Sequence, residues 1–108
     1  MLAYVILQIS SSIVPQSNLN DYLDHVRRNE IPSYAAAPGL VSVWLLQRSF
    51  VAYVEVMTVS SWWSREAMQK FAEHLRFCAN AGTEYGSIQL DPRTYEVVVS
   101  CDGEHREE

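Results

Sequence analysis

The chain has 108 residues and a net charge of -5 at pH 7; 48% of its residues are hydrophobic and 19% are charged. That length fits one domain and leaves no room for a second. An acidic chain with no basic cluster larger than Arg27-Arg28 lacks a surface that could follow a phosphate backbone, so we expect no nucleic acid partner.

No segment predicts contact with a membrane. No apolar run approaches the roughly 18 residues that a membrane-spanning helix requires. Residues 2–14 are apolar enough to suggest a secretion signal, but no Lys or Arg precedes them, and Gln8 and Ser10 interrupt them. We therefore expect a soluble, cytoplasmic protein without a membrane partner.

The cysteines and short motifs argue against several chemistries. Cys78 and Cys101 match no redox or metal spacing, so two reduced thiols are the expected state. No three His, Cys or acidic residues recur at a ligand spacing, and neither a glycine-rich phosphate loop nor a GxSxG motif occurs. The sequence thus predicts no metal and no other cofactor, and it disfavours hydrolase and nucleotide chemistry.

The first third of the chain predicts a strand followed by a helix. Residues 4–10 predict a strand that ends in the serine run before Pro15, because proline lacks the donor that a ladder needs. Ser17 or Asn18 can cap the helix that follows. The apolar stripe of that helix has the spacing of one buried face and comprises Leu19, Tyr22, Leu23 and Val26.

A proline is expected to interrupt this helix. The residue before a proline avoids the helical region, so Ile31-Pro32 predicts a break, and residues 32–37 predict a separate short helical turn that Pro38-Gly39 closes. Irregular backbone of this kind often opens the mouth of a cavity. Tyr34 is therefore a candidate hydrogen-bond donor to a ligand.

Residues 40–48 and 51–61 predict an antiparallel hairpin around Ser49-Phe50, and the alternation sorts its side chains onto two faces. The aliphatic face, suited to a covering helix, comprises Val43, Leu45, Ala52, Val54 and Val56. The other face comprises Trp44, Leu46, Arg48, Tyr53, Glu55 and Met57, with either Arg48 or Trp44 within reach of Glu55. One helical layer covers only one face, so we expect a homodimer in which Trp44, Tyr53 and Met57 contact the second subunit.

The second half of the chain completes the order of elements. Ser64 can cap a second helix, whose core-facing residues are Ala67, Met68, Phe71, Ala72, Leu75 and Cys78. Residues 87–90 and 93–101 predict the last strands, interrupted at Asp91-Pro92, and residues 103–108 form a charged tail after a single domain of residues 1–102. The order β, α, β, β, α, β predicts an α+β, ferredoxin-like split βαβ fold with a four-stranded antiparallel sheet.

Several short stretches share their order and spacing with a known family. They are residues 31–34 (IPSY), Pro38-Gly39, the series Trp62, Ser64, Glu66, Ala67 and Phe71, and residues 92–98 (PRTYEVV). Together they resemble the antibiotic biosynthesis monooxygenase family. The resemblance implies a dimeric α+β barrel with a ligand pocket between the helices and the sheet of each subunit. In the cofactor-free oxygenases of this family, a Trp that matches Trp62 lines the pocket.

The chain departs from the catalytic patterns of this family. The cofactor-free oxygenases carry an Asn where this chain has Thr58 and a Tyr where it has Met68. Haem-degrading members carry an Asn in the first strand, which residues 4–10 lack, and a His where this chain has Ala72. The resemblance therefore leaves the oxygenase chemistry open and disfavours haem degradation.

Two residues are the candidate catalytic groups. His74 lies at the edge of the second helix stripe, and an imidazole that titrates near neutral pH can act as a general base. Trp62 is a candidate pocket wall, although an indole at a strand end can equally fill the core. The other candidate substrate contacts are Tyr34, Thr58, Met68, Phe71 and Tyr85. His25 and His105 are expected to face solvent.

Three functions stay open on these grounds. The leading hypothesis is a cofactor-independent monooxygenase that acts on a small aromatic, polyketide or quinol-type substrate. The alternatives are a non-catalytic dimeric module that binds a small ligand, and an isomerase or cyclase on the same fold. An open cavity that contains Trp62 and His74 favours chemistry, whereas a pocket filled by Met68, Phe71 and Tyr34 favours the module.

Overall fold

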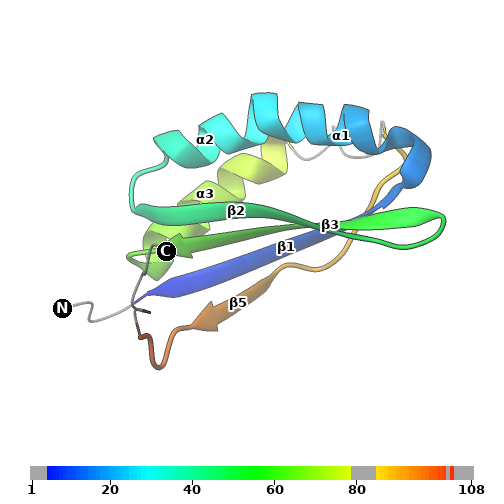
Figure 1. The fold of residues 1–108 in the computed structure, drawn as a ribbon. Helices are drawn as coiled ribbons and strands as arrows, with labels where there is room; N and C mark the ends of the chain where they lie inside the picture. Colours follow the sequence, from blue (N-terminus) through cyan, green and yellow to red (C-terminus); the bar gives the residue numbers. More distant parts are fainter. Residues whose placement is uncertain (1–4, 79–84, 102, 104–108) are drawn as a thin grey trace, which may run out of the picture.

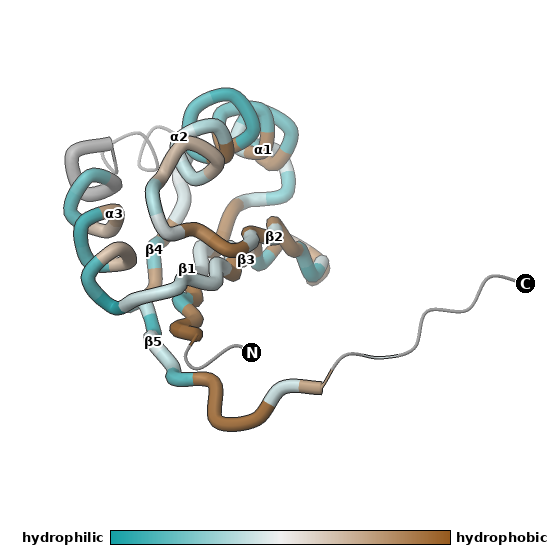
Figure 2. Tube along the Cα trace, turned by 90° about the vertical axis from the view of Figure 1, so that its left-hand side faces the viewer, coloured by the Kyte–Doolittle hydropathy of each residue, from teal (hydrophilic) through white to brown (hydrophobic). Residues whose placement is uncertain are grey.

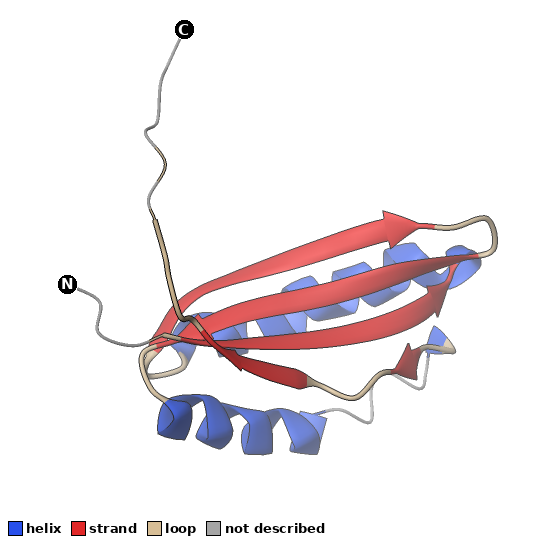
Figure 3. Ribbon diagram, turned by 90° about the horizontal axis from the view of Figure 1, so that it is seen from below, coloured by secondary structure: helices blue, strands red, loops and turns tan. Residues whose placement is uncertain are grey.

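The computed structural model describes residues 5–78, 85–101 and 103, and it confirms the predicted ferredoxin-like α+β architecture (Figure 1). The strands are β1 (Ile6–Pro15), β2 (Leu40–Ser49), β3 (Tyr53–Trp62), β4 (Ile88–Gln89) and β5 (Arg93–Glu96). The helices are α1 (Leu19–His25), α2 (Ile31–Ala36) and α3 (Arg65–Cys78). The antiparallel sheet has the order β2-β3-β1-β4, and β5 also pairs with β1. The last strand of the predicted four-stranded sheet is thus present as two short strands, β4 and β5. All three helices cover one face of the sheet (Figure 3).

The first strand is longer than predicted. It runs through the serines to Pro15 because β1 pairs with β3 over its whole length, from the Ile6–Trp62 pair to the Pro15–Tyr53 pair. Continuous ladder hydrogen bonds outweigh the turn preference of serine, and Pro15 is tolerated because it is the last residue of the strand. The last strand is shorter than predicted. Residues 93–101 do not form one strand, because β5 ends at Glu96 and the pairing with β1 stops after the Val97 amide bonds the Val5 carbonyl.

The hairpin turn lies two residues later than predicted. The Phe50 amide donates to the Tyr53 carbonyl at 2.8 Å, so Val51-Ala52 is the turn and Ala52 is not part of the aliphatic face. The pairing partner of each residue changes by an even number of positions, which leaves the side chains on their predicted faces. The observed register sets Arg48 directly opposite Glu55, and their side chains form an ion pair at 3.0 Å.

The helix before β2 does not break at Ile31-Pro32. A π-helical turn (Val26–Glu30) joins α1 to α2, and the backbone stays helical through Glu30 and Ile31 (Figure 1). Proline is tolerated here because it lies in the first turn of α2, where its missing donor costs little. The N-cap position of α1 is Asn18, one of the two predicted residues, but its side chain makes no capping hydrogen bond and donates to the Tyr85 carbonyl instead. The chain enters α1 through a 3-10 turn (Gln16–Asn18).

Two apolar clusters hold the helices on the sheet. The first, the Val14 cluster, comprises Val14, Tyr22, Leu23, Val26, Val54 and Val56. The second, the Trp62 cluster, comprises Ile6, Tyr34, Trp62, Met68 and Phe71. The predicted cap at Ser64 is confirmed, because its hydroxyl accepts the Ala67 amide at 3.1 Å and so fixes where α3 begins. Met68 and Phe71 of α3 face the core as predicted, while the side chains of Leu75 and Cys78 lie outside the described residues.

The middle of the helix-facing sheet surface is polar rather than aliphatic. Alternation places five polar residues between the two clusters, here called the polar strip: Gln8, Ser10 and Ser12 of β1, and Thr58 and Ser60 of β3. The pairing sets Gln8 beside Ser60 and Ser10 beside Thr58. A buried sheet face that is polar at its centre needs hydrogen-bond partners from the helix layer or from a ligand.

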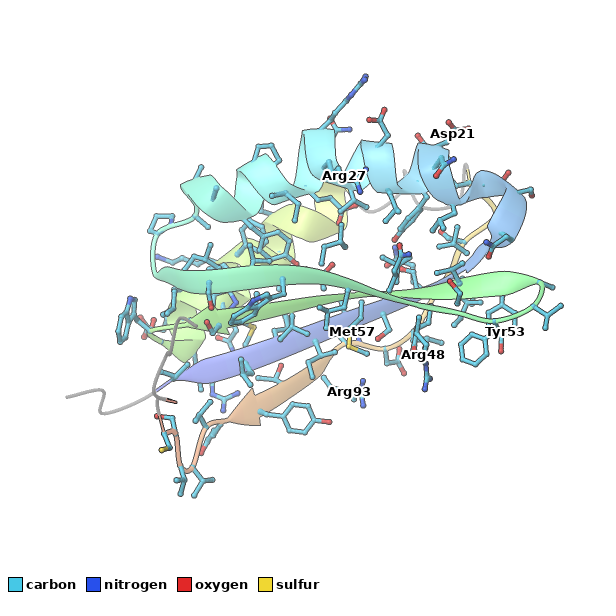
Figure 4. All side chains as sticks on the ribbon, viewed as in Figure 1. Asp21, Arg27, Arg48, Tyr53, Met57 and Arg93 are labelled. Atoms are coloured by element: carbon cyan, nitrogen blue, oxygen red, sulfur yellow. The ribbon has the colours of Figure 1, made fainter. Side chains whose placement is uncertain are left out.

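The opposite face of the sheet is uncovered by helices. Figure 4 shows Arg48, Tyr53, Met57 and Arg93 on this side. Its exposed large apolar side chains include Trp44, Leu46, Tyr53, Ile88 and Tyr95. Residues 97–99 are hydrophobic and run away from the sheet (Figure 2), and Val98 and Val99 are almost fully exposed. The apolar residues of the open sheet face therefore form a group rather than scattered single residues, which is typical of an interaction surface.

Candidate ligand site

Trp62 lies in the core. Its indole is 0% exposed, and its Nε1 donates to the Ser60 hydroxyl at 2.9 Å. Its ring centroid is 5.2 Å from that of Phe71 and 6.4 Å from that of Tyr34. Trp62 therefore acts as a rigid wall behind these two rings rather than as an exposed contact surface.

Tyr34 is the polar residue of the Trp62 cluster whose side chain makes no hydrogen bond to another described residue. It is 2% exposed, and its ring lies 4.4 Å from that of Phe71. Burial raises the pKa of its hydroxyl far above the usual range for tyrosine, and the nearby Glu30 and Tyr22 act in the same direction. No hydrogen bond joins this hydroxyl to another described residue. Tyr34 is thus a neutral phenol that can donate a hydrogen bond to a ligand.

His74 lies in a surface cleft between α2 and α3. The cleft has a volume of about 580 Å³ and is lined by Ser33, Ala36, Ala37, Pro38, Ser64, Glu66, Ala67, Lys70, Phe71 and His74. The His74 side chain is exposed, and its ring centroid is 6.2 Å from that of Phe71. Phe71 separates the cleft from the Trp62 cluster because its ring contacts both. The cleft brings His74 and Phe71 together but does not include Trp62 or Tyr34.

Tyr85 lies at the other end of the molecule from Trp62. Its ring packs edge-on against Tyr22, with centroids 6.0 Å apart, and lies 5.6 Å from His25. Its carbonyl accepts a hydrogen bond from Asn18 at 2.8 Å. His25 is half-buried rather than fully in solvent. The predicted site residues therefore divide between the two apolar clusters, the polar strip and the cleft.

Glu30 is the site residue that the sequence did not reveal. It belongs to the π-helical turn, is half-buried, and lies four residues from both Val26 and Tyr34, which are buried. Burial raises the pKa of its carboxyl group, and the positive potential of His25 opposes this. Its spacing of four residues from both Val26 and Tyr34 could have placed Glu30 on the buried side of a continuous helix. The break expected at Pro32 instead placed Glu30 at a helix end, where a carboxylate is normally solvated.

No metal centre is found in the part of the chain that the structure describes, because no three His, Cys, Asp or Glu side chains come together there. In that same part, no helix has the length and apolar character needed to cross a membrane. Cys101 is exposed and the side chain of Cys78 lies outside the described residues, so the expected thiol state stays a prediction.

Neither a protein-family model nor a curated protein matches the sequence. Solved structures do match the fold. A proposed antibiotic biosynthesis monooxygenase from Bacillus cereus is 19% identical and superposes with a TM-score of 0.65 over 94% of this chain and 100% of its own. The chain shares the ferredoxin-like α+β fold of this structure. The resemblance drawn from the sequence motifs is supported at the level of the fold.

Two further structures describe the range of this fold. A dimeric ferredoxin-like protein from an uncultured marine organism has a TM-score of 0.71 at 8% identity, covering 91% of this chain and 99% of its own. A variant of SnoaB, a cofactor-independent oxygenase from Streptomyces nogalater, has a TM-score of 0.61 at 12% identity, covering 91% and 95%. Similarity at this level establishes architecture and leaves the chemistry to the site.

Proposed function

We propose that the protein is a cofactor-independent monooxygenase that acts on a small, flat aromatic, polyketide or quinol-type substrate. The observation that carries this proposal is the polar strip between two apolar clusters, with the unbonded Tyr34 hydroxyl in the layer above it. A hydroxylated aromatic molecule has matching chemistry, since its rings are apolar and its oxygen atoms need donors and acceptors. The fold, shared with SnoaB, supports the same assignment.

The reaction balances without a metal or flavin. An anthrone-type substrate loses two hydrogens from one ring carbon and gains one atom of molecular oxygen there, and the other oxygen atom leaves as water. Removing a proton first makes the ring carbon electron-rich enough to react with oxygen. The protein therefore has to bind the ring, accept a proton and stabilise a negative oxygen atom.

The predicted residues take separate roles in this proposal. Tyr34 donates a hydrogen bond to the substrate oxygen, and Thr58 contacts the substrate from the polar strip. Phe71 and Met68 form the apolar boundary, with Trp62 holding Phe71 in place. His74 accepts or relays a proton at the cleft. Tyr85 packs against the Val14 cluster, so it contacts the substrate only if the substrate extends to that cluster.

We also propose that two subunits associate through the open sheet face. Trp44 is 52% exposed although it lies in the middle of β2, and it shares this face with Tyr53 and Met57. A similar protein of this fold is a dimer. Covering this face removes a large apolar surface from water, at about 25 cal/mol per Å² of apolar area.

One observation favours the alternative of a non-catalytic binding module. Tyr34, Trp62, Met68 and Phe71 fill the space at one end of the sheet, with ring centroids 4.4 to 6.4 Å apart. The cleft that contains His74 also excludes Trp62. A module would bind the same ligands but would consume no oxygen. An isomerase or cyclase would convert its substrate, again without oxygen.

Oxygen uptake separates the three functions. Purified protein is incubated in air with an anthrone-type and a quinol-type substrate, with and without a chelator, while oxygen and product are measured. The monooxygenase predicts equal molar consumption of oxygen and substrate, unchanged by the chelator. Tyr34→Phe and His74→Gln should each lower the rate, whereas Asp24→Asn, an exposed change on α1, should not. Binding without oxygen uptake on any substrate would leave the module as the function.

A further inference from the structure

The π-helical turn keeps Glu30 on the side of the helix layer that faces the sheet. Tyr22, Val26, Glu30 and Tyr34 follow one another at four-residue intervals, and the other three are buried. In a regular α-helix a four-residue step rotates a side chain by about 40° beyond one turn, so three steps would turn the last residue about 120° away. A π-helical turn holds more residues per turn and reduces this drift.

The Glu30 carboxylate has no partner among the described residues. It forms neither an ion pair nor a hydrogen bond there, although it is half-buried. Asp24, six residues earlier, is exposed and pairs with Arg28 at 3.3 Å. Glu30 is half-buried, and no fully enclosed side-chain N or O atom of the described residues lacks a partner, so this carboxylate keeps some contact with solvent and is free to accept a hydrogen bond from a ligand.

Two further polar groups near the helix–sheet boundary lack partners within residues 5–78 and 85–101. The Gln8 side chain is 8% exposed, yet no hydrogen bond joins its amide to another described residue. The Tyr34 hydroxyl likewise makes no hydrogen bond to another described residue. Gln8 lies on the polar strip, and Glu30 and Tyr34 lie on the helix layer that covers the sheet. No fully enclosed side-chain N or O atom of the described residues lacks a partner, so these three groups reach solvent, and a ligand could replace that water and complete their hydrogen bonds.

We propose that Glu30 is the general base of the proposed monooxygenase, and this inference rests on that proposed function. One carboxylate oxygen of Glu30 accepts the proton of a phenolic or enolic hydroxyl of the substrate. The substrate O–H bond breaks, its electron pair stays on the substrate, and the proton forms an O–H bond on Glu30. The Tyr34 hydroxyl then stabilises the oxyanion by donating a hydrogen bond. His74, which is exposed in the cleft on the other side of Phe71, is not the group that removes this proton.

The surroundings of Glu30 suit this task. Burial raises its pKa toward the range in which a carboxylate is an effective base, and His25 limits that rise. In its own layer, His25 lowers the pKa of Glu30, and the Glu30 carboxylate in turn raises the pKa of Tyr22 and of Tyr34. The polar strip below contains no titratable side chain, and the described charged groups of α3 that line the adjoining cleft are Glu66, Lys70 and His74.

Kinetics of three variants test the role of Glu30 on a substrate that the wild type oxidises. Glu30→Gln should lower kcat/KM by about 100-fold, with KM changed by less than about threefold, and should remove the acidic limb of the pH profile. Glu30→Asp should restore part of the rate, since it keeps the carboxylate. Asp24→Asn is the matched control on the same helix layer and should leave the profile unchanged. An unchanged acidic limb in Glu30→Gln overturns the proposal.

A titration keeps the two proposals distinguishable if the wild type oxidises no substrate. The carboxyl carbon resonance of Glu30, assigned by its loss in Glu30→Gln, is followed by NMR with and without 1,8-dihydroxyanthraquinone as a non-oxidisable probe. A midpoint above the ordinary value of about 4.3 that moves further when the probe binds supports Glu30 as a proton acceptor even though oxygenation has failed. An ordinary midpoint that the probe leaves unchanged overturns the inference.

Discussion

The Trp62 indole and the Ser60 hydroxyl, two residues apart on the same face of β3, form a buried hydrogen bond of 2.9 Å. The Ser60 hydroxyl donates in turn to the Gln8 carbonyl of β1 at 3.4 Å. These contacts fix the orientation of the largest buried side chain and connect it to the edge of the polar strip. The indole then positions Phe71 at the boundary between the core and the cleft.

Trp62 and its neighbour Trp63 should differ sharply in their effect on stability. Trp62→Ala removes a fully buried indole and should lower the free energy of unfolding by about 3–5 kcal/mol. Trp63 is 51% exposed, so Trp63→Ala should change it by less than about 1 kcal/mol. Urea unfolding followed by circular dichroism measures both. Equal losses in the two variants would show that Trp62 does not anchor the core.

Gly39, between α2 and β2, should not tolerate a side chain. Its φ of +87° is one that non-glycine residues rarely adopt, and a Cβ there would lie 2.6 Å from the Ala67 Cβ of α3. Gly39→Ala should therefore cost at least about 1–2 kcal/mol of unfolding free energy. Gly103→Ala is the control, because nothing lies within 4 Å of its Cβ position.

A double variant separates the two causes of this loss. Ala67→Gly removes the atom that a Cβ on Gly39 would meet, so it should recover the steric part of the loss and leave the backbone part. Thermal unfolding of the single and double variants measures the coupling. A double variant that loses the full sum of the single effects would contradict the close approach of α3 to Gly39.

Alternation predicted the hairpin faces correctly even though its turn was misplaced. The faces depend only on whether the pairing shifts by an even or odd number of residues, and the shift was even. The sequence could therefore place Arg48 and Glu55 on one face, but it could not decide between Arg48 and Trp44 as the partner of Glu55. The exact turn could not, because Ser49, Phe50, Val51 and Ala52 include no glycine or asparagine to mark it.

The helix layer and the site were harder to predict. Local preference alone favours a break at Ile31-Pro32, but burial of Val26 and Tyr34 on one side favours continuation, and a π-helical turn satisfies both. The change of helix type then brings Glu30 toward the sheet. No periodicity of 3.6 residues contains that information. The motifs indicated Trp62 and Tyr34 but could not show that both would be buried in one cluster.

Charge on the open sheet face should dissociate the proposed dimer. Trp44→Glu and Met57→Glu each place a carboxylate in the middle of this face and should weaken association by about 30-fold or more. Gln69→Glu makes the same charge change on the exposed side of α3 and should have no effect. Sedimentation equilibrium over a micromolar concentration range measures all three. A wild type that stays monomeric, or variants that dimerise as tightly as the wild type, would exclude this interface.

Removing the charge of Glu30 should stabilise the protein at neutral pH. The pKa of Glu30 is raised in the folded state, so the folded protein holds this proton more tightly than the unfolded chain does. The stability that this group contributes is therefore complete below its unfolded pKa of about 4.3 and is lost as the pH rises through the raised value.

Glu30→Gln keeps the shape of the side chain and removes the cost of the buried charge. It should unfold at a higher temperature than the wild type at pH 7, and this difference should shrink as the pH falls toward 4. Asp24→Asn, at an exposed position on the same layer, should show no such gain. Thermal unfolding at several pH values measures the three proteins. A Glu30→Gln variant that is less stable than the wild type at pH 7, and equally so at pH 4, would mean that Glu30 makes stabilising contacts instead of facing a ligand site.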